Sequence, residues 1–61
     1  MKKYEYLVLE FKTTDSQKTL EATTAALTEK GKEGWELVSV SPIEDYNGEH
    51  SLFYFKRPLP N

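Results

Sequence analysis

Residues 34–40 (Gly-Trp-Glu-Leu-Val-Ser-Val) constrain this chain most, because they join the end of a helix directly to a strand. Glycine readily takes the left-handed backbone conformation that lies just past the last turn of a helix. The residues after Gly34 alternate between apolar and polar side chains and are rich in Trp, Leu and Val, which is typical of a strand. So short a connection lays the helix back over its own sheet. The segment therefore predicts an α+β fold.

The length and cysteine content limit how such a fold can be stabilised. With 61 residues the chain is expected to form a single domain, residues 1–61. A domain of this size buries only about 60% of its unfolded surface. The chain has no cysteine and one histidine, His50, which excludes disulfides, thiolate metal sites and a zinc site built on two histidines. Stability is then expected from packing, from oligomerisation, or from both.

A helix is predicted over about residues 15–33. Thr14 and Gln17 have the spacing of a capping box, with Thr14 as N-cap, and Asp15 and Ser16 are alternative N-caps. The residues expected to face the sheet lie at helical spacing and are Leu20, Thr24, Leu27 and Gly31. Because only two of these side chains are large and apolar, the helix must gain its stability from the sheet.

Three strands are expected, at about residues 3–12, 35–41 and 51–57. The first is apolar in both of its alternating side-chain sets, so both of its faces are expected to be covered. Between the second and third, Asn47-Gly48 favours a two-residue hairpin turn. That turn would place Pro42 opposite Phe53 at a hydrogen-bonded position, where proline has no N–H to donate. Either a bulge intervenes, or the regular ladder stops near Ser41.

The order strand, helix, strand, strand defines a compact β-α-β-β unit. A right-handed crossover leaves the first two strands parallel, and the hairpin makes the third antiparallel to the second. The expected sheet order is 1-3-2, with the third strand in the centre and the helix on one face. Pro42 supports this order, because it places proline on an edge strand, where proline is tolerated.

Both faces of this sheet are expected to be apolar. The face under the helix would carry Leu7, Leu9, Phe11, Val38, Val40, Phe53 and Phe55. The second face would carry Tyr4, Tyr6, Val8, Trp35, Leu37 and Tyr54. Whether Trp35 lies under the helix or on the second face stays open, and a one-residue bulge would exchange residues between the faces. A surface rich in Tyr and Trp is typical of interfaces and is unusual on a monomer.

Charge is expected to separate along the molecule, although the net charge is only −2. The basic end would gather Lys2, Lys3, Lys30, Lys32, Lys56 and Arg57. The opposite end would gather Asp15, Glu44, Asp45 and Glu49. The basic end suits a phosphate or carboxylate. The same residues also serve to neutralise a helix C-terminus and to keep strand ends soluble.

Three segments resemble a known family: residues 4–6 (Tyr-Glu-Tyr), residues 33–40 (Glu-Gly-Trp-Glu-Leu-Val-Ser-Val) and residues 55–58 (Phe-Lys-Arg-Pro). The family consists of short prokaryotic and phage proteins catalogued as a domain of unknown function, and the resemblance covers nearly the whole chain. It implies a compact β-α-β-β fold and brings no catalytic residues. Its phage members imply a role in host–phage conflict, as an anti-defence protein.

The residues offer little for catalysis. There is no cysteine nucleophile, and His50 lies in or beside a loop near two acidic residues, where a lone histidine is usually solvated. We expect no enzyme activity, no cofactor and no metal. The longest apolar run, residues 7–9, is far short of the ~20 residues of a membrane span. No signal-peptide pattern is present, and a cytoplasmic protein is expected.

The sequence therefore predicts a non-enzymatic binding protein that works as a homo-oligomer, most simply a dimer, through its aromatic face. A sharper hypothesis is a small anionic, nucleotide-like ligand bound where two copies meet. Its candidate contacts are Tyr4, Tyr6, Trp35 and Tyr54 for a base, and Lys56 and Arg57 for a phosphate. One alternative is a small inhibitor or adaptor that binds a host protein. Another is a single-stranded nucleic-acid binder, which the net charge of −2 disfavours.

Overall fold

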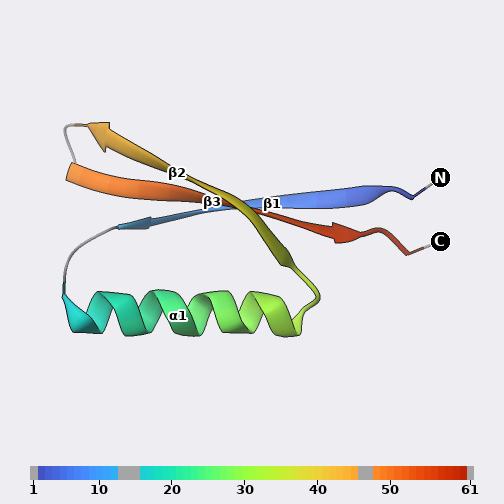
Figure 1. Ribbon diagram of the computed structural model, residues 1–61, viewed down its shortest axis with the longest axis horizontal. Coiled ribbons are helices and arrows are strands. Elements are labelled where there is room, and N and C mark those ends of the chain that lie inside the picture. Colours follow the sequence, from blue (N-terminus) through green and yellow to red (C-terminus); the bar gives the residue numbers. More distant parts are fainter. Residues whose placement is uncertain (1, 13–15, 46–47, 61) are drawn as a thin grey trace.

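The computed structural model describes residues 2–12, 16–45 and 48–60. Its elements are β1 (Tyr4–Lys12), α1 (Gln17–Lys32), β2 (Glu36–Asp45) and β3 (Gly48–Pro58). Figure 1 shows α1 lying along one side of the sheet, with both chain ends emerging at the same end of the molecule. The start of β3 and the end of β2 lie at the opposite end.

The sheet is held together by its central strand. β3 pairs antiparallel with β1 on one side and with β2 on the other, so the order is β1-β3-β2 and the two outer strands run parallel. The predicted α+β fold, the 1-3-2 order and the central third strand are confirmed. On the β1 side the register is unbroken, with Leu7 opposite Phe55 and Leu9 opposite Phe53.

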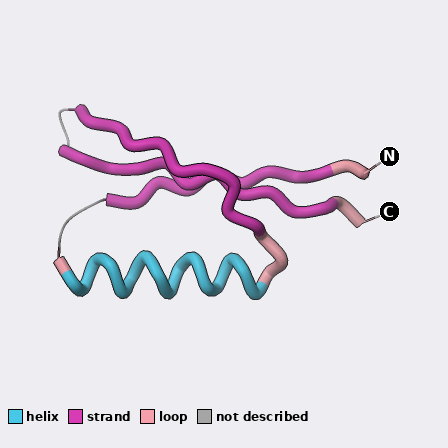
Figure 2. Tube along the Cα trace, viewed as in Figure 1, coloured by secondary structure: helices cyan, strands magenta, loops and turns pink. Residues whose placement is uncertain are grey.

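The C-terminal end of α1 is closed by Gly34, as the sequence predicts. Gly34 has a φ of 92°, and its N–H donates to the Gly31 carbonyl at 3.0 Å. The Trp35 N–H donates to the Lys30 carbonyl at 3.0 Å. These two bonds form a Schellman motif, which satisfies carbonyls of the last turn. Only residues 33–35 then separate α1 from β2 (Figure 2).

The N-terminal end of α1 is capped by Ser16, one of the alternatives that the sequence left open. The Ser16 hydroxyl oxygen accepts a hydrogen bond from the Thr19 N–H at 3.1 Å. The helix therefore begins at Gln17, too late for Gln17 to be the third residue of a capping box that starts at Thr14. Thr14 and Asp15 themselves lie outside the described residues.

α1 turns a different side to the sheet than the one predicted. Its half-buried residues lie at helical spacing one position away from the expected stripe and are Thr19, Thr23, Ala26, Leu27 and Lys30. Of the predicted stripe only Leu27 belongs to this side. Leu20 is 54% exposed, and Thr24 is exposed with its hydroxyl donating to the Leu20 carbonyl at 2.9 Å. The sheet-facing side consists largely of small side chains, which carry little hydrophobic signal.

The β2–β3 hairpin has a different register from the predicted one. The ladder ends at the pair Asp45–Gly48, and Pro42 lies opposite Ser51 rather than Phe53. The ladder thus runs past Ser41 and accommodates Pro42, which an edge strand tolerates. Of the two alternatives that the sequence left open, the one in which pairing stops near Ser41 is wrong. Asn47, half of the predicted turn, lies outside the described residues.

A bulge interrupts β2 near its start. Leu37 lies opposite Phe55 and Ser39 opposite Tyr54, so Val38 between them opposes no residue. A bulge was one of the predicted alternatives, but it lies before Pro42 and not in the hairpin tip. Because the extra residue switches the faces, Leu37 joins the helix side of the sheet. The expectation of Leu37 on the second face is wrong, and Val38, expected on the face under the helix, opposes no residue of β3.

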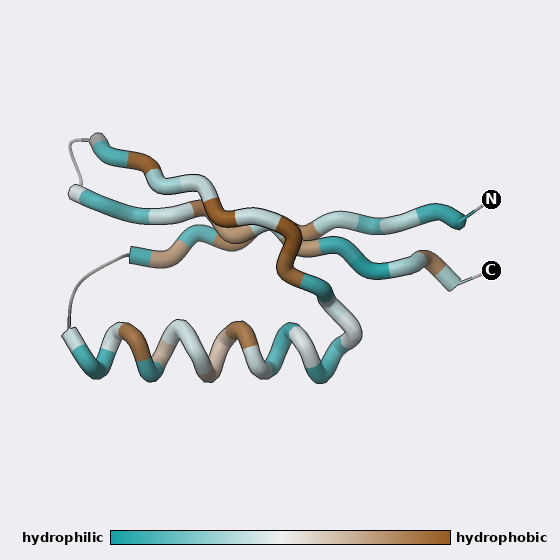
Figure 3. The backbone as a smooth tube through the Cα atoms, in the orientation of Figure 1, coloured by the Kyte–Doolittle hydropathy of each residue, from teal (hydrophilic) through white to brown (hydrophobic). Residues whose placement is uncertain are grey.

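The core lies between β3 and α1 and is small. Among the described residues, the buried ones are Phe53, Phe55 and Ser51, alternate positions of the central strand. Phe11 packs edge-on against Phe53, with ring centroids 5.0 Å apart. Figure 3 shows the hydrophobic positions of the strands gathered where the strands cross. The cover that α1 gives to one face therefore accounts for the whole of this core.

The orientation of α1 can be tested with a matched pair of leucines. A fully buried Leu→Ala change costs about 2–5 kcal/mol, so for half-buried Leu27 we expect a loss of about 1–2 kcal/mol in the free energy of unfolding. Leu20→Ala should cost less than about 0.5 kcal/mol, because that side chain is largely exposed. Urea unfolding followed by the fluorescence of Trp35, the one tryptophan of the chain, measures both. If Leu20→Ala lowered the free energy of unfolding more than Leu27→Ala does, the helix would face the sheet with the stripe that the sequence predicts.

Candidate functional site

The side of the sheet away from α1 carries an exposed aromatic cluster. Val8 lies opposite Tyr54 and Tyr6 opposite Lys56, and residues directly opposite each other project from the same face. Along β1 the residues of this face are exposed, while their neighbours on the helix side are half-buried. We call this surface the open face and define it by Tyr4, Tyr6, Val8, Tyr54 and Lys56.

The most exposed aromatic ring of the open face is that of Tyr6. Tyr6 is 71% exposed, Val8 is 51% exposed and Tyr4 is 37% exposed. Tyr54 is half-buried between the outer strands. A ring as exposed as Tyr6 offers a flat apolar surface with a polar tip, which suits contact with a partner.

Lys56 brings a positive charge into this cluster. Its ammonium nitrogen lies 5.0 Å from the centroid of the Tyr4 ring, a distance at which a cation is attracted to the ring face. Its cross-strand neighbours are Tyr6 on β1 and Glu36 on β2. Within residues 2–12, 16–45 and 48–60, no ion pair involves Lys56. The cluster therefore combines exposed rings with a cation that forms no described ion pair, with the Glu36 carboxylate on the neighbouring strand.

Arg57, the next residue along β3, projects to the other side and ties α1 to the sheet. Its Nε donates to the Glu5 carboxylate at 2.7 Å, and its Nη1 donates to the Glu33 carbonyl at the end of α1, also at 2.7 Å. Its guanidinium carbon lies 4.2 Å from the centroid of the Trp35 ring. Four groups thus meet at the helix C-terminus. We call Glu5, Glu33, Trp35 and Arg57 the arginine clamp.

The six predicted site residues therefore fall into two groups. The structure brings Tyr4, Tyr6, Tyr54 and Lys56 together on the open face. It places Trp35 and Arg57 in the arginine clamp, on the helix side, which answers the question that the sequence left open for Trp35. The guanidinium is already engaged by a carboxylate, a carbonyl and a ring. Sequence reasoning missed the part played by Glu5, which follows only from the register that sets it opposite Arg57.

Charge is distributed along the molecule much as expected. The chain ends lie together, since Tyr4 pairs with Pro58 and the Leu59 N–H donates to the Lys3 carbonyl at 2.8 Å. However, Lys30 and Lys32 pair with Glu33 and Glu29 on their own helix, at 3.7 and 3.5 Å. The net positive charge at this end is thus smaller than the number of lysine and arginine residues implies.

The opposite end of the sheet is acidic. Glu44 and Glu49 lie directly across from each other on neighbouring strands, a like-charge pairing that destabilises a sheet. The predicted Asp45 ends β2 at this end, opposite Gly48. Asp15, which was expected here too, lies outside the described residues.

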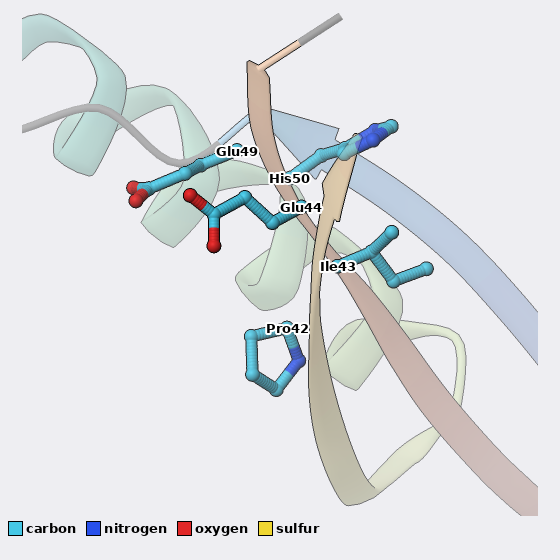
Figure 4. A pocket seen from close by; sticks show the side chains of 5 residues that line it. All are labelled: Pro42, Ile43, Glu44, Glu49 and His50. Carbon is cyan, nitrogen blue, oxygen red and sulfur yellow. The ribbon is translucent and has the colours of Figure 1, made fainter. Parts of the chain in front are cut away.

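A shallow depression of about 300 Å³ lies at this acidic end. It is lined by Pro42, Ile43, Glu44, Glu49 and His50 (Figure 4). Figure 4 shows the two glutamates on one side of the strand pair and His50 on the other. The His50 Nδ1 lies within ion-pair distance of a Glu10 carboxylate oxygen. The depression is lined by two carboxylates and contains no Tyr, Trp or Phe ring. It lies at the end of the sheet opposite Tyr4 and Lys56.

Two other kinds of site are absent from the described part of the chain. No cluster of three or more acidic or histidine side chains suited to a metal ion occurs there. No helix there has both the length and the apolar character needed to cross a membrane.

The chain belongs to a family whose function is not known. The family model described as Domain of unknown function (DUF4177) matches residues 4–58, from the first residue of β1 to the last residue of β3. This confirms the predicted membership of a family catalogued as a domain of unknown function. No curated protein and no solved structure matches the chain. The role in host–phage conflict stays a prediction.

The arginine clamp predicts that Arg57 cannot be replaced by lysine without loss. Arg57→Lys keeps the charge but cannot reach Glu5 and Glu33 together while stacking on Trp35. We expect the free energy of unfolding to fall by about 1–2 kcal/mol, allowing for partial exposure of the pair. Acrylamide should also quench Trp35 fluorescence more efficiently, because the guanidinium no longer covers the ring.

The control is Lys32→Ala, which removes an exposed ion pair on the helix and should cost less than about 0.5 kcal/mol. Equal losses for the two variants, with unchanged quenching, would show that Arg57 does not hold α1 to the sheet.

Proposed function

We propose that this protein is a non-enzymatic, homo-oligomeric binding protein whose open face takes a small anionic, nucleotide-like ligand. The observation that carries the proposal is the position of the Lys56 ammonium, 5.0 Å from the Tyr4 ring and across from the exposed Tyr6. This arrangement sets a cation and a stacking surface side by side.

The two parts of the cluster suit the two parts of a nucleotide. A base can stack on the Tyr6 ring, since base–aromatic stacking needs only an accessible ring face. A phosphate oxygen can accept a charge-assisted hydrogen bond from Lys56. Tyr4 stays under the ammonium and holds it in place, while Val8 and Tyr54 provide an apolar surface in the adjoining row.

The arginine clamp, on the helix side of the sheet, holds the strand that carries Lys56. Lys56 lies between Phe55, which is buried, and Arg57, which is fixed to α1. The backbone that carries the lysine is therefore held on both sides. A site held in place before its ligand arrives loses less conformational entropy on binding.

A protein partner is the alternative use of the same surface. An exposed patch of Tyr and Val side chains also suits the core of a protein interface. Lys56 within the patch favours the anionic ligand, because interface cores are depleted in lysine.

Binding can be measured by isothermal titration calorimetry with the four nucleoside diphosphates. Adenosine, which has a base but no phosphate, and pyrophosphate, which has phosphates but no base, are measured for comparison. We expect at least one diphosphate to bind more tightly than adenosine or pyrophosphate does. Tyr6→Ala should raise its Kd at least about fivefold, from a stacking contribution of about 1–3 kcal/mol. Lys56→Ala should raise it at least about tenfold, from a charged hydrogen bond of about 1.5–3 kcal/mol.

Lys32→Ala is the matched control, since it removes the same charge from a position on α1 away from the open face. It should leave the Kd unchanged. The proposal fails if no diphosphate binds the unmodified protein, or if all three variants bind alike.

A further inference from the structure

The homo-oligomer of the proposed function can form through the open face itself, with a ligand where two copies meet, or through a contact that leaves the open face accessible. The two edges of the sheet are the remaining places at which strands can pair. In the order β1-β3-β2, both β1 and β2 are edge strands, and each presents a row of backbone N–H and C=O groups to any chain that can pair with it.

The two edges differ in how they are protected. β2 carries a bulge at Val38 and a proline at Pro42, and both features block the addition of a further strand. β1 carries neither. Its nine residues pair with β3 in an unbroken register, which leaves an outer edge of the same length that no bulge or proline interrupts. Within the described residues, β1 pairs with β3 alone.

We propose that β1 pairs antiparallel with β1 of a second copy, which joins two three-stranded sheets into one continuous sheet of six strands. The inference deepens the proposed function, since it names the interface of the homo-oligomer, but the pairing does not require the ligand. A two-fold axis through this contact makes it self-complementary, the commonest symmetry of soluble dimers.

The sequence of β1 suits a register centred on Val8. In that register all nine residues find a partner, and Leu7 of each copy lies opposite Leu9 of the other. No residue faces a like charge. Registers centred on Glu5 or Glu10 would instead set two glutamates directly opposite each other, which destabilises a sheet.

This register also brings a second cation to the binding cluster. Lys12 of the second copy would lie directly opposite Tyr4, on the same side of the joined sheet as the open face. The same register sets Glu10 of the second copy opposite Tyr6, so each open face would be bordered by Lys56 of its own chain and by Lys12 and Glu10 of the other.

The absence of cysteine allows a direct test by spin labelling of single-cysteine variants. Val8→Cys and Ser39→Cys suit the test, because Val8, Tyr54 and Ser39 lie in one row across the same face, with Val8 on one edge strand and Ser39 on the other. In the proposed dimer the two Val8 positions lie about 5 Å apart, and the two Ser39 positions are separated by five strand spacings, or roughly 24 Å.

Electron paramagnetic resonance without added nucleotide should therefore show strong line broadening for labels at position 8 and a long distance for labels at position 39. Dilution with unlabelled protein should remove both signals. Tyr6→Cys provides a second position near the contact, and its labels should lie about 14 Å apart, four residues along paired strands.

Each other arrangement gives a different pattern. Stacking of two open faces would set both label pairs at a similar separation of about 10–15 Å. Pairing through β2 would reverse the order of the two distances. A monomer would show no interaction between labels. Any of these three results overturns the inference, and nucleotide titration decides the ligand proposal separately.

Discussion

The pairing of β3 with a strand on each side is the interaction on which the rest of the structure depends. Without β3, the two outer strands have no contact through which to form a sheet. Successive residues of this strand serve different purposes because they alternate between the two faces. Phe55 is buried under α1, Lys56 stands on the open face and Arg57 fixes the end of α1. One helix can cover only one face, so the candidate binding surface follows from the architecture.

Much of this fold could be predicted because a few residues have strong backbone requirements. Gly34 marks the end of α1, since the left-handed conformation at φ 92° suits glycine best. Pro42 indicates an edge strand, which fixes the order of the sheet. Period-two alternation separates Tyr4 and Tyr6 from Leu7 and its neighbours, so most of the open face could be identified from β1 alone.

Features that depend on packing could not be predicted in the same way. The sheet-facing side of α1 is built around threonine and alanine, and Leu20 gave the stronger but misleading signal. The bulge at Val38 has no sequence signature in this chain, so the alternation of side chains predicts the wrong face for Leu37. The arginine clamp depends on a register between residues more than fifty positions apart. For that reason the sequence alone groups Arg57 with Lys56 as a ligand contact, although the two side chains project from opposite faces.

Native mass spectrometry of freshly purified protein, across a range of concentrations, tests the central claim most directly. The claim is that a sheet covered on one face assembles with itself and holds a ligand on the other face. We expect a dimer that carries extra mass of the size of a nucleotide, and we expect Lys56→Ala to retain the dimer and lose the extra mass. A bare monomer at every concentration would contradict the account.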